Sequence, residues 1–218
     1  MTAASASIDF GQLRIRKTAR KDVTLVGEIL VDGFHDDPFW GCIDLHSKYP
    51  KAEKFFFKRW ARIVRKTSFV VVYKDEIIGH YYITPPNDPG PTFWKLMQYG
   101  LYQLPIRFGW TLTKRTIDLL DTDTAARNLM LDQRPSSEVL DAFVIKSEWR
   151  GRGIGTHVLE EFILKDRPRL ALFAHKKKVV ELYEKVGFRT LDQRMVSTGH
   201  GHEYESWGME YTAPAKTS

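Results

Sequence analysis

The sequence predicts an α/β (α+β) protein with a central mixed sheet and helices on both faces of that sheet. Three observations point to this class. Short apolar runs with strand character alternate along the chain with segments of helical periodicity. Two pairs of strand-like runs are separated by turn residues, which predicts hairpins and antiparallel pairing. The 218 residues suit one domain with a sizeable core, so we treat 1–218 as a single domain with loose tails at 1–9 and 212–218.

The predicted elements follow an order that is typical of a mixed sheet. The first half contributes a strand, two helices and a hairpin, which are Leu13–Lys17, Asp22–Phe34, Lys51–Lys66, and Thr67–Tyr73 with Ile77–Thr84. The second half contributes a strand, a helix, a strand, a helix and a hairpin, which are Glu138–Ile145, Gly153–Lys165, Arg169–Ala174, Val179–Val186, and Phe188–Ser197 with His202–Tyr211. Between them, Pro85–Pro91 ends the first hairpin, and 92–131 is a helical insert broken near Pro105 and Gly109. Gly187 is expected to cap the last helix.

Composition and charge favour an intracellular globular protein. Apolar residues make up 43% of the chain and charged residues 28%, which is ordinary for a globular domain. The net charge of +6 fits a polyanionic ligand but is too diffuse to require nucleic acid. Cys42 is the only cysteine, so an intramolecular disulfide is excluded. Neither a signal-peptide pattern nor an apolar run of roughly 18 residues is present. We therefore expect a cytoplasmic protein without a membrane span.

One short stretch carries the strongest functional signal. Glu148–Ile163 places three glycines within five residues, next to two arginines and directly before a helical pattern. A dinucleotide fingerprint would require glycine at Thr156, and a P-loop would require Gly-Lys in place of Thr156 and His157. A third phosphate-binding pattern, [Q/R]-x-x-G-x-[G/A], is matched by Arg150, Gly153 and Gly155.

This third pattern is typical of pyrophosphate binding at the start of a helix. Consecutive backbone N–H groups point at the phosphates there, and the helix dipole adds to the attraction. A Cβ at Gly153 or Gly155 would keep the phosphates away from the backbone. The alternative is a flexible surface turn before a capped helix, because short motifs often match by chance.

A second motif downstream makes the phosphate interpretation more specific. VVELYEKVGF, Val179–Phe188, lies on a predicted helix that ends in glycine and leads into a strand. Together with VIKSEWRGRGIG, Val144–Gly155, it resembles the GNAT superfamily of acetyl-CoA-dependent N-acyltransferases, most strongly over residues 138–190. The stretches GFHDDPFW, IIGHYYI and LDAFVIKSEWRGRGIG are similar to its puromycin-acetyltransferase-like branch. The resemblance implies a mostly antiparallel sheet of about seven strands, with the fourth and fifth splayed apart and a helical insert between the third and fourth.

The resemblance also implies where acetyl-CoA binds. The thioester lies between the fourth and fifth strands, and backbone groups of the fourth strand bond the pantetheine arm. The implied cofactor-binding residues are Phe143, Val144, Ile145, Arg150, Gly151, Arg152, Gly153, Ile154, Gly155, Thr156 and Lys176. Lys176 stands where the family often has an asparagine, seven residues before the tyrosine of the last helix. A lysine there either meets a coenzyme A phosphate or is a solvated charge at a helix start.

Two side chains are expected to transfer protons during direct attack of an amine on the thioester. Tyr183 stands at the position of the family's general acid, and a phenol with a reference pKa of about 10 is protonated at neutral pH. The family's proton acceptors correspond here to Val139 and Asp141, which strand alternation places on one face. Because valine cannot accept a proton, Asp141 is the candidate base. The alternative is that Asp141 holds a structural salt bridge.

Aromatic and acidic side chains are candidates for the acceptor pocket. We expect substrate contacts from Phe34, Asp37, Phe39, Trp40, His80, Tyr82 and Trp94. The aromatic-rich insert suits a lid over an apolar acceptor, an amphipathic surface on a membrane or partner, or core packing.

The predicted function is N-acetylation of a primary amine on a small molecule, for detoxification or secondary metabolism. We expect a monomer or homodimer that uses acetyl-CoA and binds no nucleic acid and no metal. The alternatives are acetylation of a peptide or protein, and a non-catalytic acyl-CoA-binding module.

Overall fold

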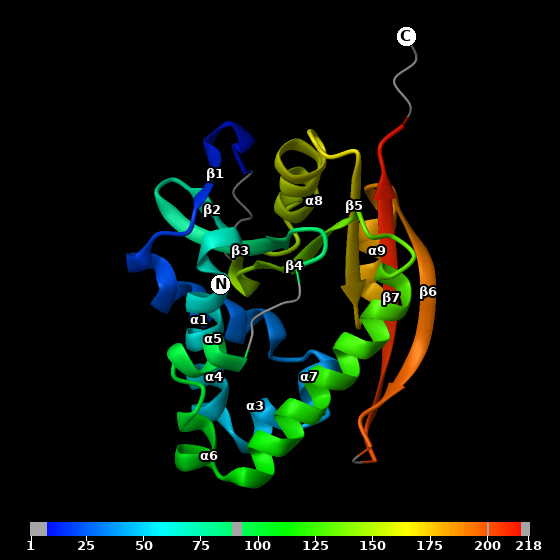
Figure 1. The fold of residues 1–218 in the computed structure, drawn as a ribbon. Helices are drawn as coiled ribbons and strands as arrows, with labels where there is room; N and C mark the ends of the chain where they lie inside the picture. The colour runs from blue at the N-terminus through cyan, green and yellow to red at the C-terminus, as the bar shows by residue number, and fades with distance from the viewer. Residues whose placement is uncertain (1–7, 89–92, 200, 215–218) are drawn as a thin grey trace, which may run out of the picture.

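A computed structural model describes residues 8–88, 93–199 and 201–214. Its centre is a seven-stranded sheet with the strand order β1-β2-β3-β4-β5-β7-β6 (Figure 1). The strands are β1 (Leu13–Lys17), β2 (Ser68–Tyr73), β3 (Glu76–Thr84), β4 (Glu138–Ile145), β5 (Arg169–Ala174), β6 (Phe188–Ser197) and β7 (Glu203–Thr212). Neighbouring strands pair antiparallel, except that β4 and β5 are parallel. The mixed, mostly antiparallel sheet predicted from the sequence is confirmed.

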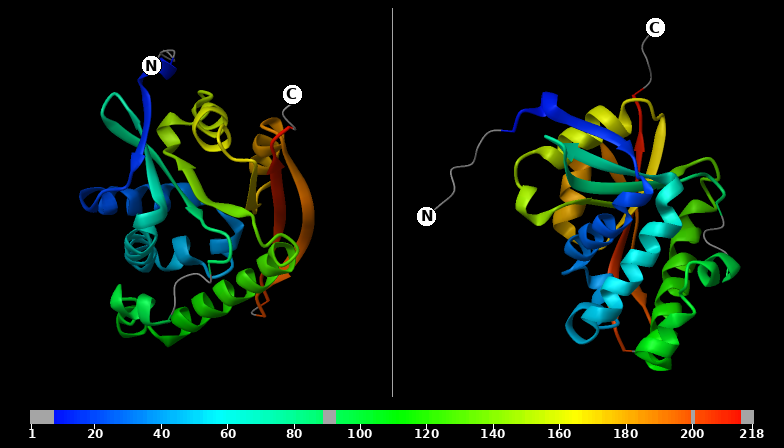
Figure 2. Two further views of the ribbon diagram at one scale, coloured as in Figure 1. Left: turned by 45° about the horizontal axis from the view of Figure 1, so that its top comes forward. Right: turned by 90° about the vertical axis from the view of Figure 1, so that its left-hand side faces the viewer.

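Helices cover both faces of the sheet, as predicted (Figures 1 and 2). The core on one face includes residues of α8 (Ile154–Val158), of the π-helical turn that continues it (Leu159–Leu164) and of α9 (Lys177–Lys185). The core on the other face includes residues of α1 (Val23–Phe34), α4 (Pro50–Val64) and α7 (Trp110–Leu131). α1 approaches β4 closely because Gly33 has no side chain, and a Cβ there would overlap the methyl groups of Val144.

β4 and β5 separate after three residue pairs. The parallel pairs are Glu138 with Leu170, Val139 with Ala171 and Leu140 with Leu172, although both strands continue beyond them. Over residues 141–145, β4 pairs with β3 and has no strand partner on its other edge within the described residues. The predicted splay between the fourth and fifth strands is therefore confirmed.

The predicted insert forms three helices, α5 (Phe93–Gln98), α6 (Gln103–Phe108) and α7. The expected break near Pro105 is wrong, since Pro105 lies inside α6 and the chain turns at 99–102 instead. Proline is tolerated there because the N–H groups in the first turn of a helix have no helical partner. The break at Gly109 is confirmed, with a φ of +88°. From that point α7 runs diagonally toward β6 and β7 (Figure 1).

Other differences concern element boundaries. Two short helices, α2 (Pro38–Gly41) and α3 (Leu45–Lys48), lie where no helix was predicted. β7 includes Thr212, and Ala213 N donates to Pro168 O, so the expected C-terminal tail begins later than residue 212. Ile8 packs against the core and Asp9 caps the 3-10 turn Phe10–Gln12, so the tail expected over 1–9 ends before these two residues. Residues 1–7 and 215–218 of the expected tails, and part of the proline-rich run, 89–91, lie outside the described residues.

The predicted ends of the last two helices agree with the structure. The helix expected over 153–165 is confirmed as α8 and its π-helical continuation. Gly187 follows α9 with a φ of +95°, and its N–H donates to Glu184 O, which is the predicted cap. No helix within the described ranges combines the length and the apolar character needed to cross a bilayer.

Candidate active site

The turn between β4 and α8 has a backbone suited to an anion. Gly151 and Gly153 have φ angles of +74° and +76°, in the left-handed region that favours glycine. α8 begins directly after Gly153, so its first N–H groups lack helical partners and lie at the positive end of the helix dipole. Gly155 lies in this first turn, and a Cβ there would meet Phe143 and Leu182 only at 3.9–4.0 Å. The turn is therefore open to a ligand that approaches the backbone.

The two arginines of the turn contact neighbouring parts of the chain. Arg150 Nε donates to Ile145 O at 2.7 Å, and its Nη2 lies 3.1 Å from the Asp32 carboxylate on α1. The Arg152 guanidinium lies over the Trp149 ring, 5.2 Å from the ring centroid, and the side chain is exposed. Arg150 thus fixes the turn to β4 and α1, while Arg152 remains at the surface beside the turn.

A β-bulge shapes β4 next to the splay. Tyr82 pairs with Asp141 and His80 pairs with Val144, so two residues of β4 lie opposite a single residue of β3. Ala142 is the bulged residue and has a φ of +49°. Such strained bulges re-aim side chains and backbone groups, often next to functional sites.

Beyond the bulge, alternate backbone groups of β4 point into the gap. Lys146 N donates to Ile78 O on the β3 side. Because the N–H and C=O groups of successive strand residues point to opposite edges, those of Phe143 and Ile145 point toward β5. These are the groups that the sequence assigned to the pantetheine arm. The side chain of Phe143 packs against the α8 core, whereas Val144 packs on the α1 side.

Tyr183 lies on α9 beside the gap. Its ring packs on Phe188, and the residue is 6% exposed. Burial first, and the negative charge of Asp141 second, raise the pKa of Tyr183 above its ordinary value. The hydroxyl is therefore protonated at neutral pH, as a proton donor must be.

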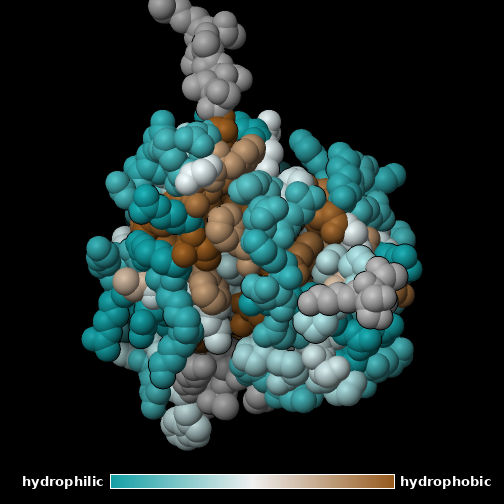
Figure 3. Space-filling model, turned by 90° about the horizontal axis from the view of Figure 1, so that it is seen from above, coloured by the Kyte–Doolittle hydropathy of each residue, from teal (hydrophilic) through white to brown (hydrophobic). Residues whose placement is uncertain are grey.

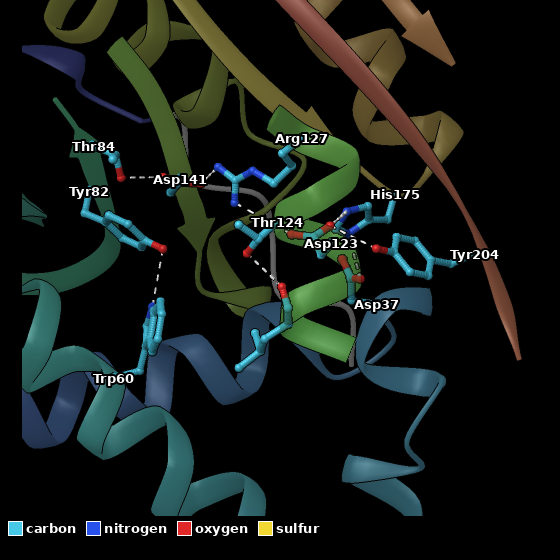
Figure 4. Close-up of polar contacts among 11 residues, drawn as sticks. Asp37, Trp60, Tyr82, Thr84, Asp123, Thr124, Arg127, Asp141, His175 and Tyr204 are labelled. Atoms are coloured by element: carbon cyan, nitrogen blue, oxygen red, sulfur yellow. Dashed lines mark hydrogen bonds and ion pairs between the residues drawn. The ribbon is translucent and has the colours of Figure 1, made fainter. Parts of the chain in front are cut away.

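Both carboxylate oxygens of Asp141 are occupied. Arg127 Nη2, from α7, lies 2.7 Å from Asp141 Oδ1, and Thr84 Oγ1, from β3, donates to Asp141 Oδ2 at 2.7 Å (Figure 4). Burial acts to lower the pKa of Arg127, but the charges of Asp141 and Asp123 outweigh it and raise that pKa. Arg127 is therefore a permanent cation beside Asp141.

The polar chain continues from Arg127 to the ends of β5 and β7 (Figure 4). Arg127 Nη1 lies 3.8 Å from Asp123 Oδ2, and Tyr204 donates its hydroxyl to Asp123 Oδ1 at 2.9 Å. His175, directly after β5, has Nδ1 3.2 Å from Asp37 Oδ1 and Nε2 3.9 Å from Asp123 Oδ1. The chain thus links the strands on both sides of the splay through α7.

A second contact ties the loop after α1 to the start of α9. The Lys176 ammonium pairs with the Asp36 carboxylate at 2.5 Å, and this hydrogen bond holds the pKa of Asp36 below its ordinary value. Beside this loop lies an open groove of about 680 Å³ with three carboxylates in its lining. The lining residues are Glu28, Val31, Asp32, His35, Asp36, Lys54, Ser147 and Arg150.

The predicted aromatic acceptor residues near α1 are part of the core. Phe39 and Trp40 are 5% and 8% exposed, and Phe34 stacks on Phe57. Burying large rings contributes strongly to folding, so aromatic residues in this region pack inward rather than lining an open pocket. Asp37 caps α2 by accepting from Phe39 N, and it belongs to the polar chain through His175.

The remaining predicted acceptor residues lie in three different environments. His80 is fully buried, neither ring nitrogen has a hydrogen-bond partner among the described residues, and burial lowers its pKa to about 3. Tyr82 accepts a hydrogen bond from Trp60 Nε1 at 3.3 Å, and burial raises its pKa. Trp94, on α5, is 74% exposed. The seven residues expected at the acceptor therefore do not form one pocket in this structure.

Four members of the polar chain were not predicted from the sequence. They are Asp123, Arg127, His175 and Tyr204. Two signals pointed to some of them. Asp123 and Arg127 are four residues apart on one helix face, and His175 directly follows the strand that was predicted to splay away from the fourth strand. Tyr204 carries no such local signal.

Comparison with known proteins identifies the fold. No protein-family model matches the chain, and no curated protein matches its sequence. A polyamine N-acetyltransferase from Drosophila melanogaster superposes with a TM-score of 0.61 at 10% identity, covering 92% of this chain and 100% of that one. The chain has the GNAT fold.

Two further solved structures support this assignment. One is a structure from Corynebacterium glutamicum described as histone acetyltransferase HPA2 and related acetyltransferase. It superposes with a TM-score of 0.60 at 18% identity, covering 95% of this chain and 99% of that one. The apo form of an agmatine N-acetyltransferase variant gives 0.60 at 11% identity, covering 93% and 100%. The GNAT fold expected from residues 138–190 is thus confirmed, whereas the puromycin-acetyltransferase-like branch stays a prediction.

Proposed function

We propose that this chain is an acetyl-CoA-dependent N-acetyltransferase that acts on a primary amine of a small molecule. The observation that carries the proposal is the edge of β4 over residues 141–145, which has no strand partner among the described residues and leads directly into the glycine turn at the start of α8. A ligand with an amide-bearing arm and a pyrophosphate matches this sequence of groups.

The residues present fit coenzyme A on chemical grounds. The backbone groups of Phe143 and the N–H of Ile145 point into the gap, where they can bond the pantetheine amides as a further strand would, while the Ile145 carbonyl already accepts from Arg150. Left-handed Gly151 and Gly153 free the N–H groups of the turn for the pyrophosphate. The end of the molecule that carries α8 shows apolar side chains near its centre with hydrophilic ones around them (Figure 3), which suits an apolar arm with a charged end.

When bound, acetyl-CoA supplies an acetyl group activated as a thioester. The chain's own contribution is to hold that group at the splay and to place a proton donor beside it. The raised pKa of Tyr183 keeps a proton on its hydroxyl, which serves to protonate the departing thiolate.

Asp141 serves a structural role in this proposal. Arg127 and Thr84 each occupy one oxygen of this carboxylate, so neither oxygen is free to face an incoming amine. Its ion pair fixes α7 against β4 and so positions the acceptor side of the gap. The second sequence-based alternative, a salt bridge, is therefore the one that we carry forward.

A cationic amine is the acceptor class that the surroundings favour. In the groove beside Ser147 and Arg150, Asp32 and Asp36 already pair with Arg150 and Lys176, so Glu28 is the carboxylate of the lining that is left to attract an ammonium group. The similar structures are named for agmatine, polyamine, arylalkylamine and histone acetyltransferases, so small amines and a lysine peptide are the acceptors to compare. The second candidate function is acetylation of a peptide or protein. The cytoplasm and a role in detoxification remain our expectations.

Ligand-dependent melting tests the cofactor assignment. Acetyl-CoA at about 100 times its Kd should raise the Tm by roughly 5–10 °C, while NAD and ATP should not. Gly153→Glu should abolish this shift, because the new carboxylate occupies the turn and repels phosphate. Gly109→Glu is the matched control, since it also introduces a carboxylate at a glycine with positive φ and open space but lies far from the turn. A larger shift with NAD than with acetyl-CoA would overturn the proposal.

Release of free thiol in the presence of acetyl-CoA then tests turnover. Agmatine, spermidine, phenylethylamine and a lysine peptide should be compared at equal concentration. Faster release with one or more of the small amines supports the preferred function, and faster release with the peptide supports the second. Stabilisation by acetyl-CoA without thiol release above the no-acceptor rate for any amine would favour a non-catalytic acyl-CoA-binding module.

A further inference from the structure

The end of the molecule opposite α8 presents large apolar side chains to solvent. α6 and the first turn of α7 form this end (Figures 1 and 2). Tyr102, Ile106 and Trp110 are 50%, 78% and 75% exposed, and we call these three residues the α6 tip. In contrast, Leu104 on the same helix is 5% exposed and anchors α6 to the protein.

The two segments that meet beside the α6 tip are rich in positive charge. Residues 50–67 and 93–115 together contain eleven basic residues and one acidic residue, a net charge of +10, against +6 for the whole chain. The one acidic residue, Glu53, is buried and lies 3.0 Å from His46. α4 and α6 pack against each other through Phe55 and Phe108, so both basic segments flank the tip.

Two arginines are held next to the apolar tip. The guanidinium groups of Arg59 and Arg107 lie 4.9 and 5.5 Å from the centroid of the Phe55 ring. Burial first, then the nearby charges of Arg62 and Arg107, lower the pKa of Arg59. Within the part of the chain that the structure describes, no carboxylate forms an ion pair with these three arginines. The three arginines therefore repel one another, and binding of an anionic partner would reduce this repulsion.

We propose that the α6 tip docks on the surface of an anionic lipid bilayer. Ile106, Trp110 and Tyr102 would enter the headgroup region, where tryptophan and tyrosine are favoured and an isoleucine leaves water. Arg59, Arg62 and Arg107 would lie at the level of the anionic headgroups. The protein then binds the membrane peripherally, with the glycine turn at the opposite end of the molecule and open to solvent.

The chemistry of the tip favours a bilayer over nucleic acid. A phosphate backbone matches the arginines equally well, and aromatic rings can stack on bases. Ile106, however, is the most exposed residue of the tip, and an aliphatic side chain has no stacking partner in a nucleic acid. A bilayer accommodates the isoleucine, the aromatic rings and the arginines at the same time.

Co-sedimentation with vesicles tests the proposal. The full chain should bind vesicles of phosphatidylcholine with about 30% phosphatidylserine at least tenfold more tightly than pure phosphatidylcholine, and added salt should weaken the binding. The double variant Ile106→Ser, Trp110→Ser should lose about tenfold or more of this affinity, since two apolar side chains no longer leave water. Its Tm should stay near that of the original chain, because both side chains are exposed.

Matched controls separate the tip from general surface effects. Leu129→Ser with Met195→Ser alters two apolar residues that are 56% and 59% exposed elsewhere, and it should bind vesicles as the original chain does. Equal binding to both kinds of vesicle, or unchanged binding of the tip variant, would refute the proposal. So would tighter binding to a single-stranded RNA oligonucleotide that the tip variant loses, or a tip variant whose only change is loss of self-association. None of these outcomes depends on acetyl transfer.

Discussion

The ion pair between Asp141 and Arg127 can be tested by changing either partner. Asp141→Asn keeps the shape of the side chain but removes the charge 2.7 Å from Arg127 Nη2. Breaking a fully buried ion pair costs about 3–5 kcal/mol, because the remaining charge is left without a partner. The Arg127 side chain is 25% exposed and keeps Asp123 at 3.8 Å, so water and Asp123 reduce the cost to about 2 kcal/mol.

This loss corresponds to a Tm lower by roughly 4–8 °C for a chain of this size. Arg127→Met with Asp141→Asn should cost less than the sum of the two single variants by about 1–2 kcal/mol, since neither charge is then left alone. Urea unfolding of the four proteins measures this coupling. Asp121→Asn, an exposed aspartate on α7, serves as the control and should change stability by less than about 0.5 kcal/mol.

The same variants decide whether Asp141 is a base. The structural role requires that the activity of Asp141→Asn stays low at every pH, in step with the loss of stability. If the variant is as stable as the original chain and its activity recovers at high pH, where free amine accumulates, then Asp141 is the proton acceptor and the structural interpretation is refuted.

Three further predictions concern residues around the gap. Tyr183→Phe should leave the Kd for acetyl-CoA nearly unchanged and lower kcat by roughly 100-fold, measured by thiol release; an unchanged kcat when chemistry is rate-limiting would remove Tyr183 from the mechanism. Because the pKa of His80 is about 3 when folded and near 6.5 when unfolded, only the unfolded chain takes up a proton there between these values. Stability should therefore fall as the pH is lowered below about 6.5, by up to about 1.4 kcal/mol per pH unit. His80→Leu should flatten that slope in urea unfolding at pH 5 and pH 7, and an identical slope would contradict the assignment. Gly33→Ala should cost about 1–3 kcal/mol by overlap with Val144, and adding Val144→Ala should relieve part of that cost; additive losses would show that α1 moves away instead.

Much of the fold was determined by local sequence patterns. The strands at 13–17, 138–145 and 169–174 have the predicted bounds, because period-two runs and turn residues act within a few residues. The glycine turn could also be predicted from the sequence, since left-handed backbone conformations at 151 and 153 strongly favour glycine. The predicted boundaries of helices were wrong where they depend on more than the local sequence pattern. Pro105, for example, lies in the first turn of a helix rather than between helices.

The polar contacts of the site depended on tertiary structure. Asp141 was the one carboxylate within the apolar run Val139–Ile145, and only the packing of α7 beside β4 identified Arg127 as its partner. Lys176 and Asp36 are 140 residues apart, and no local pattern pairs them. Which charged side chains pair depends on how close they lie in the folded protein. The number of residues between two different elements does not reveal that distance.

The bulge at Ala142 is the clearest case. Strict alternation would place Asp141, Phe143 and Ile145 on one face of β4. The inserted residue reverses this phase, so Asp141 points to α7 while Phe143 and Ile145 point to the α8 core. Sequence alone determined that β4 is a strand with one carboxylate, Asp141, inside its apolar run from Val139 to Ile145. The register of β4 against β3, which fixes the bulge, decided which side of the sheet each of its side chains reaches.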